Sequence, residues 1–186
     1  MFIQTETTPN PETLKFIPGC EVVPGQAIEI KSLEEAHISP LAEALFTLES
    51  INSVFLGSDF ISITKMAKNG WDDIKPSIMS IILDHFTTGL PVLNNENATS
   101  NHLHELDLDN EIVKQINELI ETRIRPAVAM DGGDITLHSF EDGIVYVHLR
   151  GACSGCPSAT ATLKTGIENL LKHFVPEVIE VRPVPE

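Results

Sequence analysis

The sequence predicts an α+β protein built from two small domains. Both halves combine short runs that alternate polar and apolar residues, as strands do, with segments of helical apolar spacing. Neither half repeats the strand–helix–strand unit of a parallel sheet, which favours α+β over α/β. Residues 87–107 lack apolar periodicity and are rich in Asn, Thr and Ser. Such long loops are uncommon inside a compact domain, so we expect domains at 1–88 and 108–186 joined by a linker at 89–107.

The first half is expected to fold in the order β-β-α-β-β-α. "TLKFIP" and "AIEIK" read as strands, and "INSVFLG" and "FISITKM" form a second pair around a tight turn at Ser58 and Asp59. Between the pairs, "SPLAEALFTL" places Ser39 as a helix N-cap and Pro40 at the first helical position. "WDDIKPSIMSIILDHF" predicts an apolar helix, in which Pro76 is tolerable only in the first turn.

The second half is expected to fold in the order α-β-β-α-β. "LDNEIVKQINELIETRIRPAVAM" has apolar residues at offsets of three and four, which mark an amphipathic helix. "DITLHSF" and "IVYVHLR" flank Glu141, Asp142 and Gly143, a pattern typical of a hairpin with a short turn. A helix opened by Pro157 and a last strand in "EVIEVRPV" complete the order.

Charge and composition exclude several classes of partner. The formal net charge is −15 and is spread over the whole chain, without a local basic patch. Phosphate backbones and anionic membrane surfaces would be repelled, so we expect no nucleic acid and no membrane as partners. No apolar run approaches the roughly 20 residues that span a bilayer. The first residues, "MFIQTETTPNPETLKF", resemble neither a secretory signal nor a transit peptide.

The segment "RGACSGCPSAT" carries two of the three cysteines, Cys153 and Cys156, as a C-x-x-C pair. In a reducing compartment such a pair more often serves metal or redox chemistry than a structural disulfide. A strand ends at the pair and a helix begins just after it. Unpaired N–H groups at the helix start are expected to lower the pKa of Cys156 and to favour its thiolate, with Arg150 adding to the effect.

Three kinds of site remain open from the residues alone, and an iron–sulfur site is favoured. Such a cluster usually takes four thiolates, so a second copy of the chain, small thiols or a client protein would complete it. A zinc site also needs four ligands, with His138, His148 and His173 as candidates beside the cysteines. A redox dithiol normally lies in a strand–helix–strand unit, whereas an antiparallel hairpin precedes this pair.

Two further features need a structural interpretation. In "DGGD", Asp131 and Asp134 are candidate ligands for a divalent cation, but a turn entering the strand is the favoured interpretation. Its two glycines would also let this segment pass close to the loop that carries the cysteines. Cys20 lies in the other half without a partner at ligand spacing, and we leave it without a role.

Several motifs together resemble the Nfu/NifU family of iron–sulfur cluster scaffolds. In the second half "DGGD", "GACSGCPS" and "LKTGIE" resemble the cluster-binding NifU-like domain. In the first half "TPNPETLKF", "SPLAEALF", "VFLGSDFISITK" and "WDDIKPSI" resemble the N-terminal domain of Nfu proteins. The resemblance covers nearly the whole chain. One departure is Ala159, where the family often has a second Ser after "CPS".

The resemblance implies a carrier and not an enzyme. It implies that Cys153 and Cys156 bind a labile [4Fe–4S] cluster shared between the two chains of a homodimer. The carrier would receive its cluster from an upstream scaffold and deliver it to apo-proteins. Because no transit peptide is seen, we expect a bacterial cytoplasmic protein, with a processed mitochondrial form as the alternative. A thioredoxin-like oxidoreductase or a zinc module using the same pair is the alternative function.

Overall fold

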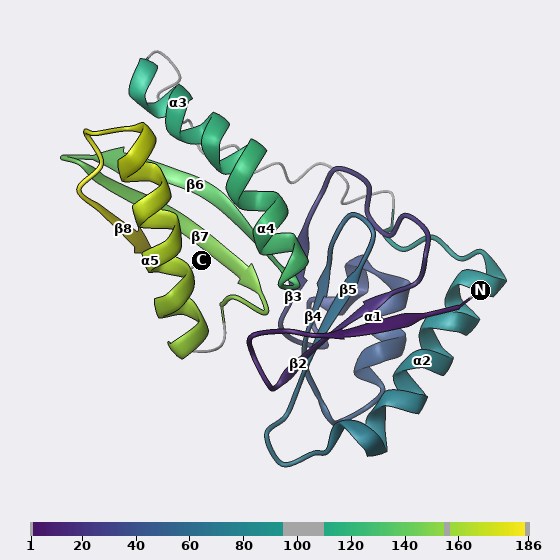
Figure 1. Cartoon of the computed structure of the whole chain (residues 1–186). Coiled ribbons are helices and arrows are strands. Elements are labelled where there is room, and N and C mark those ends of the chain that lie inside the picture. Colours follow the sequence, from purple (N-terminus) through teal and green to yellow (C-terminus); the bar gives the residue numbers. More distant parts are fainter. Residues whose placement is uncertain (1, 95–109, 155–156, 185–186) are drawn as a thin grey trace. The chain divides into compact units, whose positions relative to one another are not determined.

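The computed structural model describes residues 2–94, 110–154 and 157–184, and its chain divides into two units (Figure 1). The units are Met1–Ser100 and Asn101–Glu186, and each is an α+β fold with its own core, which confirms the predicted fold class. Most of the expected linker, residues 95–107, lies outside the described residues. Among the helices that are described, none combines the length and apolar character needed to cross a membrane.

The first unit is a five-stranded antiparallel sheet in the order β1-β2-β5-β4-β3, with helices packed on one face. Alternate strand residues such as Phe16, Val54 and Ile63 are fully buried against the helices because strand side chains alternate between faces. The elements are β1 (Gln4–Thr7), β2 (Thr13–Ile17), β3 (Ile28–Ile30), η1 (Ala36–Ile38), α1 (Pro40–Phe46), β4 (Ile51–Leu56), β5 (Ile61–Lys65) and α2 (Trp71–Thr88).

Local signals in the first half are confirmed at two places. The Ser39 side chain accepts a hydrogen bond from the N–H of Ala42 and caps α1, which begins at Pro40. Ser58 and Asp59 form the turn between β4 and β5, closed by the Gly57 N–H donating to the Phe60 carbonyl at 2.9 Å. Strand β1 is an addition to the expected order, because the polar "QTET" carries no apolar alternation.

Pro76 does not lie in the first turn of its helix, contrary to the expectation. Helix α2 begins at Trp71, so Pro76 is its sixth residue and cannot donate a hydrogen bond to the Asp72 carbonyl. The proline side chain is exposed. The helix tolerates it because the buried stripe of Ile74, Ile78 and Ile82 holds both sides of the interruption against the sheet.

The first unit continues past the end of α2 to at least Asn94. Ser39 donates from its hydroxyl to the Val92 carbonyl at 2.6 Å. Asn94 donates from its backbone N–H to Ile38 and from its side-chain amide to the His37 carbonyl. Val92 and Leu93 pack against the first core. This segment is therefore bonded to the domain although its composition resembles that of a linker.

The second unit has a three-stranded sheet in the order β6-β7-β8, with β6 and β7 antiparallel and β7 and β8 parallel. Figure 1 shows α5 running alongside β7 and β8. Residues from four helical elements, α3, η3, α4 and α5, and from one face of the sheet form a single core. The elements are α3 (Glu111–Leu119), η3 (Ile120–Ile124), α4 (Arg125–Met130), β6 (Gly133–Glu141), β7 (Ile144–Gly151), α5 (Pro157–Phe174) and β8 (Glu180–Pro183).

The expected amphipathic helix is one helical run with a wider turn in its middle. The Arg125 N–H donates to the Ile120 carbonyl, five residues back, which is the bond of a π-turn. Pro126 follows directly and cannot donate to Thr122, so the wider turn accommodates a break that the proline imposes. The predicted hairpin is also present, with Asp142 and Gly143 both at positive φ, as a two-residue type I′ turn requires.

Candidate functional site

The candidate site is the loop between β7 and α5 that carries the C-x-x-C pair. Strand β7 ends at Gly151, whose φ of +68° is accessible mainly to glycine and starts a tight turn. The backbone N–H and the hydroxyl of Ser154 both donate to the Gly151 carbonyl, at 3.1 and 2.9 Å. Cys153 lies in this turn. Cys156 lies outside the described residues and directly precedes α5 in sequence.

The Cys153 side chain points into the second core. It is only 4% exposed and packs among the buried apolar residues. Gly133, the first residue of β6, leaves room for it, because a Cβ there would lie 2.7 Å from the Cys153 sulfur. It would also lie 2.7 Å from the Arg150 carbonyl oxygen. The expectation that the "DGGD" glycines let this segment pass close to the cysteine loop is thus confirmed at Gly133.

Backbone contacts hold the same two segments together beside the thiol. The Ala152 N–H donates to the Gly132 carbonyl at 3.2 Å, and Gly132 itself has a φ of +80°. Gly132 also donates to the Ala129 carbonyl at the end of α4. The cysteine turn is therefore anchored to the junction between α4 and β6, which fixes where the Cys153 sulfur lies.

Asp134 takes part in an ion pair, which agrees with the structural interpretation of "DGGD". Its buried carboxylate accepts from Arg125 at both oxygens, 2.6 Å from Nε and 3.2 Å from the second guanidinium nitrogen. Arg125 also donates to Glu121 at 2.8 Å. Burial alone would lower the pKa of Arg125, but these bonds outweigh it and raise that pKa. Nothing in the sequence marks Arg125 as the partner of Asp134, because a separation of nine residues follows no helix or strand spacing.

The electrostatics of the buried cysteine differ from those expected at a helix start. Burial, together with the smaller effect of the nearby charges of Asp131 and Asp134, raises the pKa of the Cys153 thiol to about 12. Cys153 is therefore a neutral thiol at physiological pH in the ligand-free fold. The lowered pKa was expected for Cys156, which the structure does not describe. Binding a metal at Cys153 requires that the proton leave.

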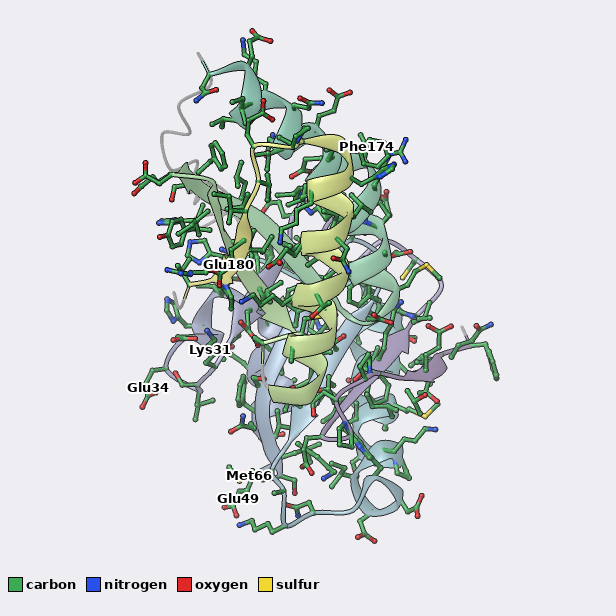
Figure 2. All side chains as sticks on the ribbon, turned by 60° about the vertical axis from the view of Figure 1, so that its left-hand side comes forward. Lys31, Glu34, Glu49, Met66, Phe174 and Glu180 are labelled. Atoms are coloured by element: carbon green, nitrogen blue, oxygen red, sulfur yellow. The ribbon has the colours of Figure 1, made fainter. Side chains whose placement is uncertain are left out.

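The strands around the cysteine loop differ from the arrangement that we used as an argument against redox chemistry. We expected the antiparallel hairpin to set this pair apart from dithiols in strand–helix–strand units. Strand β8 instead pairs in parallel with β7, so β7, α5 and β8 form such a unit and the cysteines lie at its strand-to-helix turn. Helix α5 is joined to β8 by the Lys164–Glu180 ion pair at 3.1 Å, and Figure 2 shows Glu180 beside α5.

The proposed zinc ligands do not gather around Cys153. His138 and His148 lie against each other on the β6–β7 sheet, with ring nitrogens 3.0 Å apart. His173 lies at the end of α5 with its ring against Phe174, which Figure 2 labels. Within the described residues no three His, Cys, Asp or Glu side chains converge as a metal site. Cys20 is half-buried in the first unit and has a free thiol.

These features define a two-domain α+β protein whose second domain carries a C-x-x-C pair with Cys153 buried. Residues 3–89 match the family described as "Scaffold protein Nfu/NifU N terminal", and residues 116–182 match the "NifU-like domain". Both cysteines of the pair fall inside the second match. The chain belongs to the Nfu/NifU family, as its motifs indicated.

Whole-chain relatives agree with this assignment. The protein named "NFU1 iron-sulfur cluster scaffold homolog, mitochondrial" of Drosophila willistoni is 48% identical over 185 residues, which are 99% of this chain and 64% of that protein. Its namesake in Drosophila persimilis is 47% identical over 99% of this chain and 65% of that protein. The chain thus spans slightly less than two thirds of these relatives. A solution structure of a NifU-like protein from Saccharomyces cerevisiae is 31% identical, with a TM-score of 0.47, over 51% of this chain and 86% of that one.

The relatives overturn the expected location. From the sequence we expected a bacterial cytoplasmic protein, because no transit peptide was seen. The similar proteins are named as mitochondrial and come from flies, so that expectation is wrong. The first residues of a sequence are a weak basis for its location, because a targeting segment is not part of the mature fold.

Proposed function

We propose that this chain is a mitochondrial carrier of iron–sulfur clusters. In this proposal it receives a cluster from an upstream scaffold, holds it through Cys153 and Cys156, and passes it to apo-proteins. The observation that carries the proposal is the family match at residues 116–182, which contains both cysteines. The relatives that match 99% of the chain are named as iron–sulfur cluster scaffolds.

The count of sulfur ligands supports a cluster shared between two chains. Clusters of the two-iron and four-iron kinds usually take four thiolates. The chain has three cysteines, of which Cys20 belongs to the other unit. A two-fold pair of chains would bring four equivalent sulfurs to one place. We propose a [4Fe–4S] cluster in this arrangement, with the homodimer formed when the cluster is bound.

Two properties of the chain's own residues would affect cluster loading: the release of the Cys153 proton, and the room that glycine leaves beside the Cys153 sulfur. The buried Cys153 thiol loses its proton when it becomes a ligand, so loading should release protons to solvent. Gly133 leaves room for the sulfur to lie against β6, and the Gly132 carbonyl holds the turn by accepting from the Ala152 N–H. Delivery is an exchange of these thiolates for those of the client. Each iron–sulfur bond to this chain is replaced by one to the client and no covalent catalysis is required, so we propose a carrier and not an enzyme.

Anaerobic reconstitution with iron and sulfide tests this function. The full chain should develop the visible absorption of an iron–sulfur cluster, and Cys153→Ser and Cys156→Ser should each abolish it. Cys20→Ser is the matched control and should retain the cluster. Transfer is then measured as activation of an apo-enzyme by the loaded chain. Loss of the cluster in Cys20→Ser alone, or full retention in Cys153→Ser, would contradict the ligand assignment.

A dithiol oxidoreductase is the second candidate, favoured by the β7–α5–β8 unit that places the pair at a strand-to-helix turn. Reduction of insulin disulfides by the apo-chain, in the presence of a reductant, measures this activity. We expect the rate to stay at the background of the Cys153→Ser variant, because a thiol with a pKa near 12 is almost entirely unreactive at neutral pH. A rate well above that background would favour the oxidoreductase.

A further inference from the structure

A second group of potential ligands lies on the outer face of the β6–β7 hairpin. Nδ1 of His138 and Nε2 of His148 are 3.0 Å apart. Their rings have centroids 4.7 Å apart and are inclined at 76°. From the sequence, both histidines were candidate zinc ligands beside the cysteines. The structure instead brings the two histidines to each other.

A β-bulge produces this pairing. Leu137 lies opposite Val147 and Ser139 lies opposite Tyr146, so His138 is an extra residue between two regular pairs. Leu137 and Val147 are buried in the second core, which leaves His138 and His148 on the other face of the sheet. Bulges re-aim side chains and are over-represented next to functional sites. The extra residue here directs one imidazole toward another on the neighbouring strand.

We propose that His138 and His148 form a bis-imidazole site for a late first-row divalent metal ion, separate from the cysteine loop. Metal–nitrogen bonds of about 2.0–2.1 Å place two nitrogens on one ion about 2.9 Å apart at a right angle and about 3.3 Å apart at a tetrahedral angle. The observed 3.0 Å lies within this range. A modest rotation of the rings aims both lone pairs at one ion, which replaces the proton between them.

The chemistry of the pair selects the class of ion. Neutral imidazole suits Zn²⁺, Cu²⁺ and Ni²⁺, and affinity for a nitrogen site rises along the first row to Cu²⁺. Water would fill the remaining positions, so the ion would stay exchangeable. Two cationic side chains lie near the pair along the strands: Arg150, two residues from His148 on β7, and Arg182, which is opposite Tyr146 on β8 and bonded to Glu180 at 2.9 Å. That bond reduces the repulsion that Arg182 would exert on a cation.

A metal titration of the full chain with Cys20, Cys153 and Cys156 replaced by Ser tests the site, because no thiolate can then compete. With Zn²⁺ as the probe, the ring ¹⁵N resonances of His138 and His148 should shift together and saturate at one equivalent. His138→Gln and His148→Gln should each weaken Zn²⁺ binding about tenfold or more, because one of two chelating ligands is lost. His173→Gln is the matched control and should bind as the parent does.

Two results would overturn the proposal. One is unchanged Zn²⁺ affinity in the His138→Gln/His148→Gln double variant. The other is the absence of any ring shift in the parent at millimolar Zn²⁺, which would leave the pair as a proton-sharing hydrogen bond. In the chain with its cysteines intact, both Gln variants should load an iron–sulfur cluster like the parent. A loss of loading there would show that the two sites are not separate.

Discussion

At the scale of single residues, the geometry of the cysteine turn depends on Gly133, because a glycine has no Cβ. Gly133 faces the Cys153 sulfur and the Arg150 carbonyl so closely that any Cβ would overlap both. The two glycines of "DGGD" predicted that this segment could pass close to the cysteine loop. They could not indicate that the thiol would be buried, because burial depends on packing between β6, β7 and the helices.

Gly133→Ala should destabilise the second domain and impair cluster loading. The added methyl group must displace backbone or the sulfur, which costs about 1–3 kcal/mol in a packed interior. Chemical denaturation followed by circular dichroism measures the first effect, and visible absorption after reconstitution measures the second. Gly166→Ala in α5 is the control, since nothing lies within 4 Å of its Cβ position. It should be neutral or stabilising, because alanine favours helix. Equal behaviour of the two variants would refute the steric role of Gly133.

His85 gives the first domain a dependence on pH. Burial lowers the pKa of His85, although the charge of Asp84 opposes this, and its Nε2 meets no partner among the described residues. The folded state therefore binds fewer protons than the unfolded state as pH falls through the ordinary histidine value. The contribution of His85 is present above that value and is lost below it, at a slope of at most about 1.4 kcal/mol per pH unit.

Urea unfolding at pH 7.5 and 5.5, followed by the fluorescence of Trp71, checks this dependence, because Trp71 is the chain's only tryptophan and lies in the same domain. The parent should lose more stability between the two pH values than His85→Leu does. His37→Leu, which changes an exposed histidine of the same domain, is the control and should keep the parental loss. An identical loss in the parent and in His85→Leu would rule out a neutral buried His85.

At the scale of elements, local signals predicted most helices and strands, and long-range pairing escaped prediction. The Ser39 cap, the turn at Ser58 and Asp59, and the Asp142–Gly143 turn are local, and all three are present. The parallel pairing of β8 with β7 depends on a crossover through α5, which no local pattern shows. The bulge at His138 did leave a signal, because the core-facing positions Ile135, Leu137 and the partly buried Phe140 are spaced by two and then by three.

Helix α2 should be more stable without its proline. Pro76→Ala restores a donor for the Asp72 carbonyl and removes the ring that crowds it, and the exposed proline gives up no core contact. We expect a gain of about 1–2 kcal/mol in the free energy of unfolding. This is less than the cost of about 3 kcal/mol for a proline inside a helix, because the unfolded chain becomes more flexible when the proline is removed. Trp71 fluorescence in urea measures it. Ser77→Ala, an exposed neighbour in the same helix, should change stability by less than about 0.5 kcal/mol. A destabilised Pro76→Ala would show that the proline serves the fold.

At the scale of the whole molecule, the two domains contribute differently to the proposed carrier. The second domain contains both cysteines of the pair, whereas the first has a complete core of its own and only the unassigned Cys20. The first domain also binds the start of the connecting segment through Asn94. One domain of one chain therefore cannot supply four thiolates, and the number of chains per cluster can be measured.

The loaded carrier should be a dimer with one cluster for two chains. A monomer of 20.4 kDa supplies two neighbouring thiolates, and a cluster usually takes four, so loading without added thiols should double the mass measured by light scattering. Iron and sulfide analysis of the same fraction should give half a cluster per chain. Cys153→Ser, treated in parallel, should keep the mass of its apo form. Added glutathione tests the ligand count independently, because small thiols that replace the second chain should return the loaded protein toward the monomer mass. A loaded protein that stays monomeric with a complete cluster, in the absence of any small thiol, would show that the chain supplies every ligand itself.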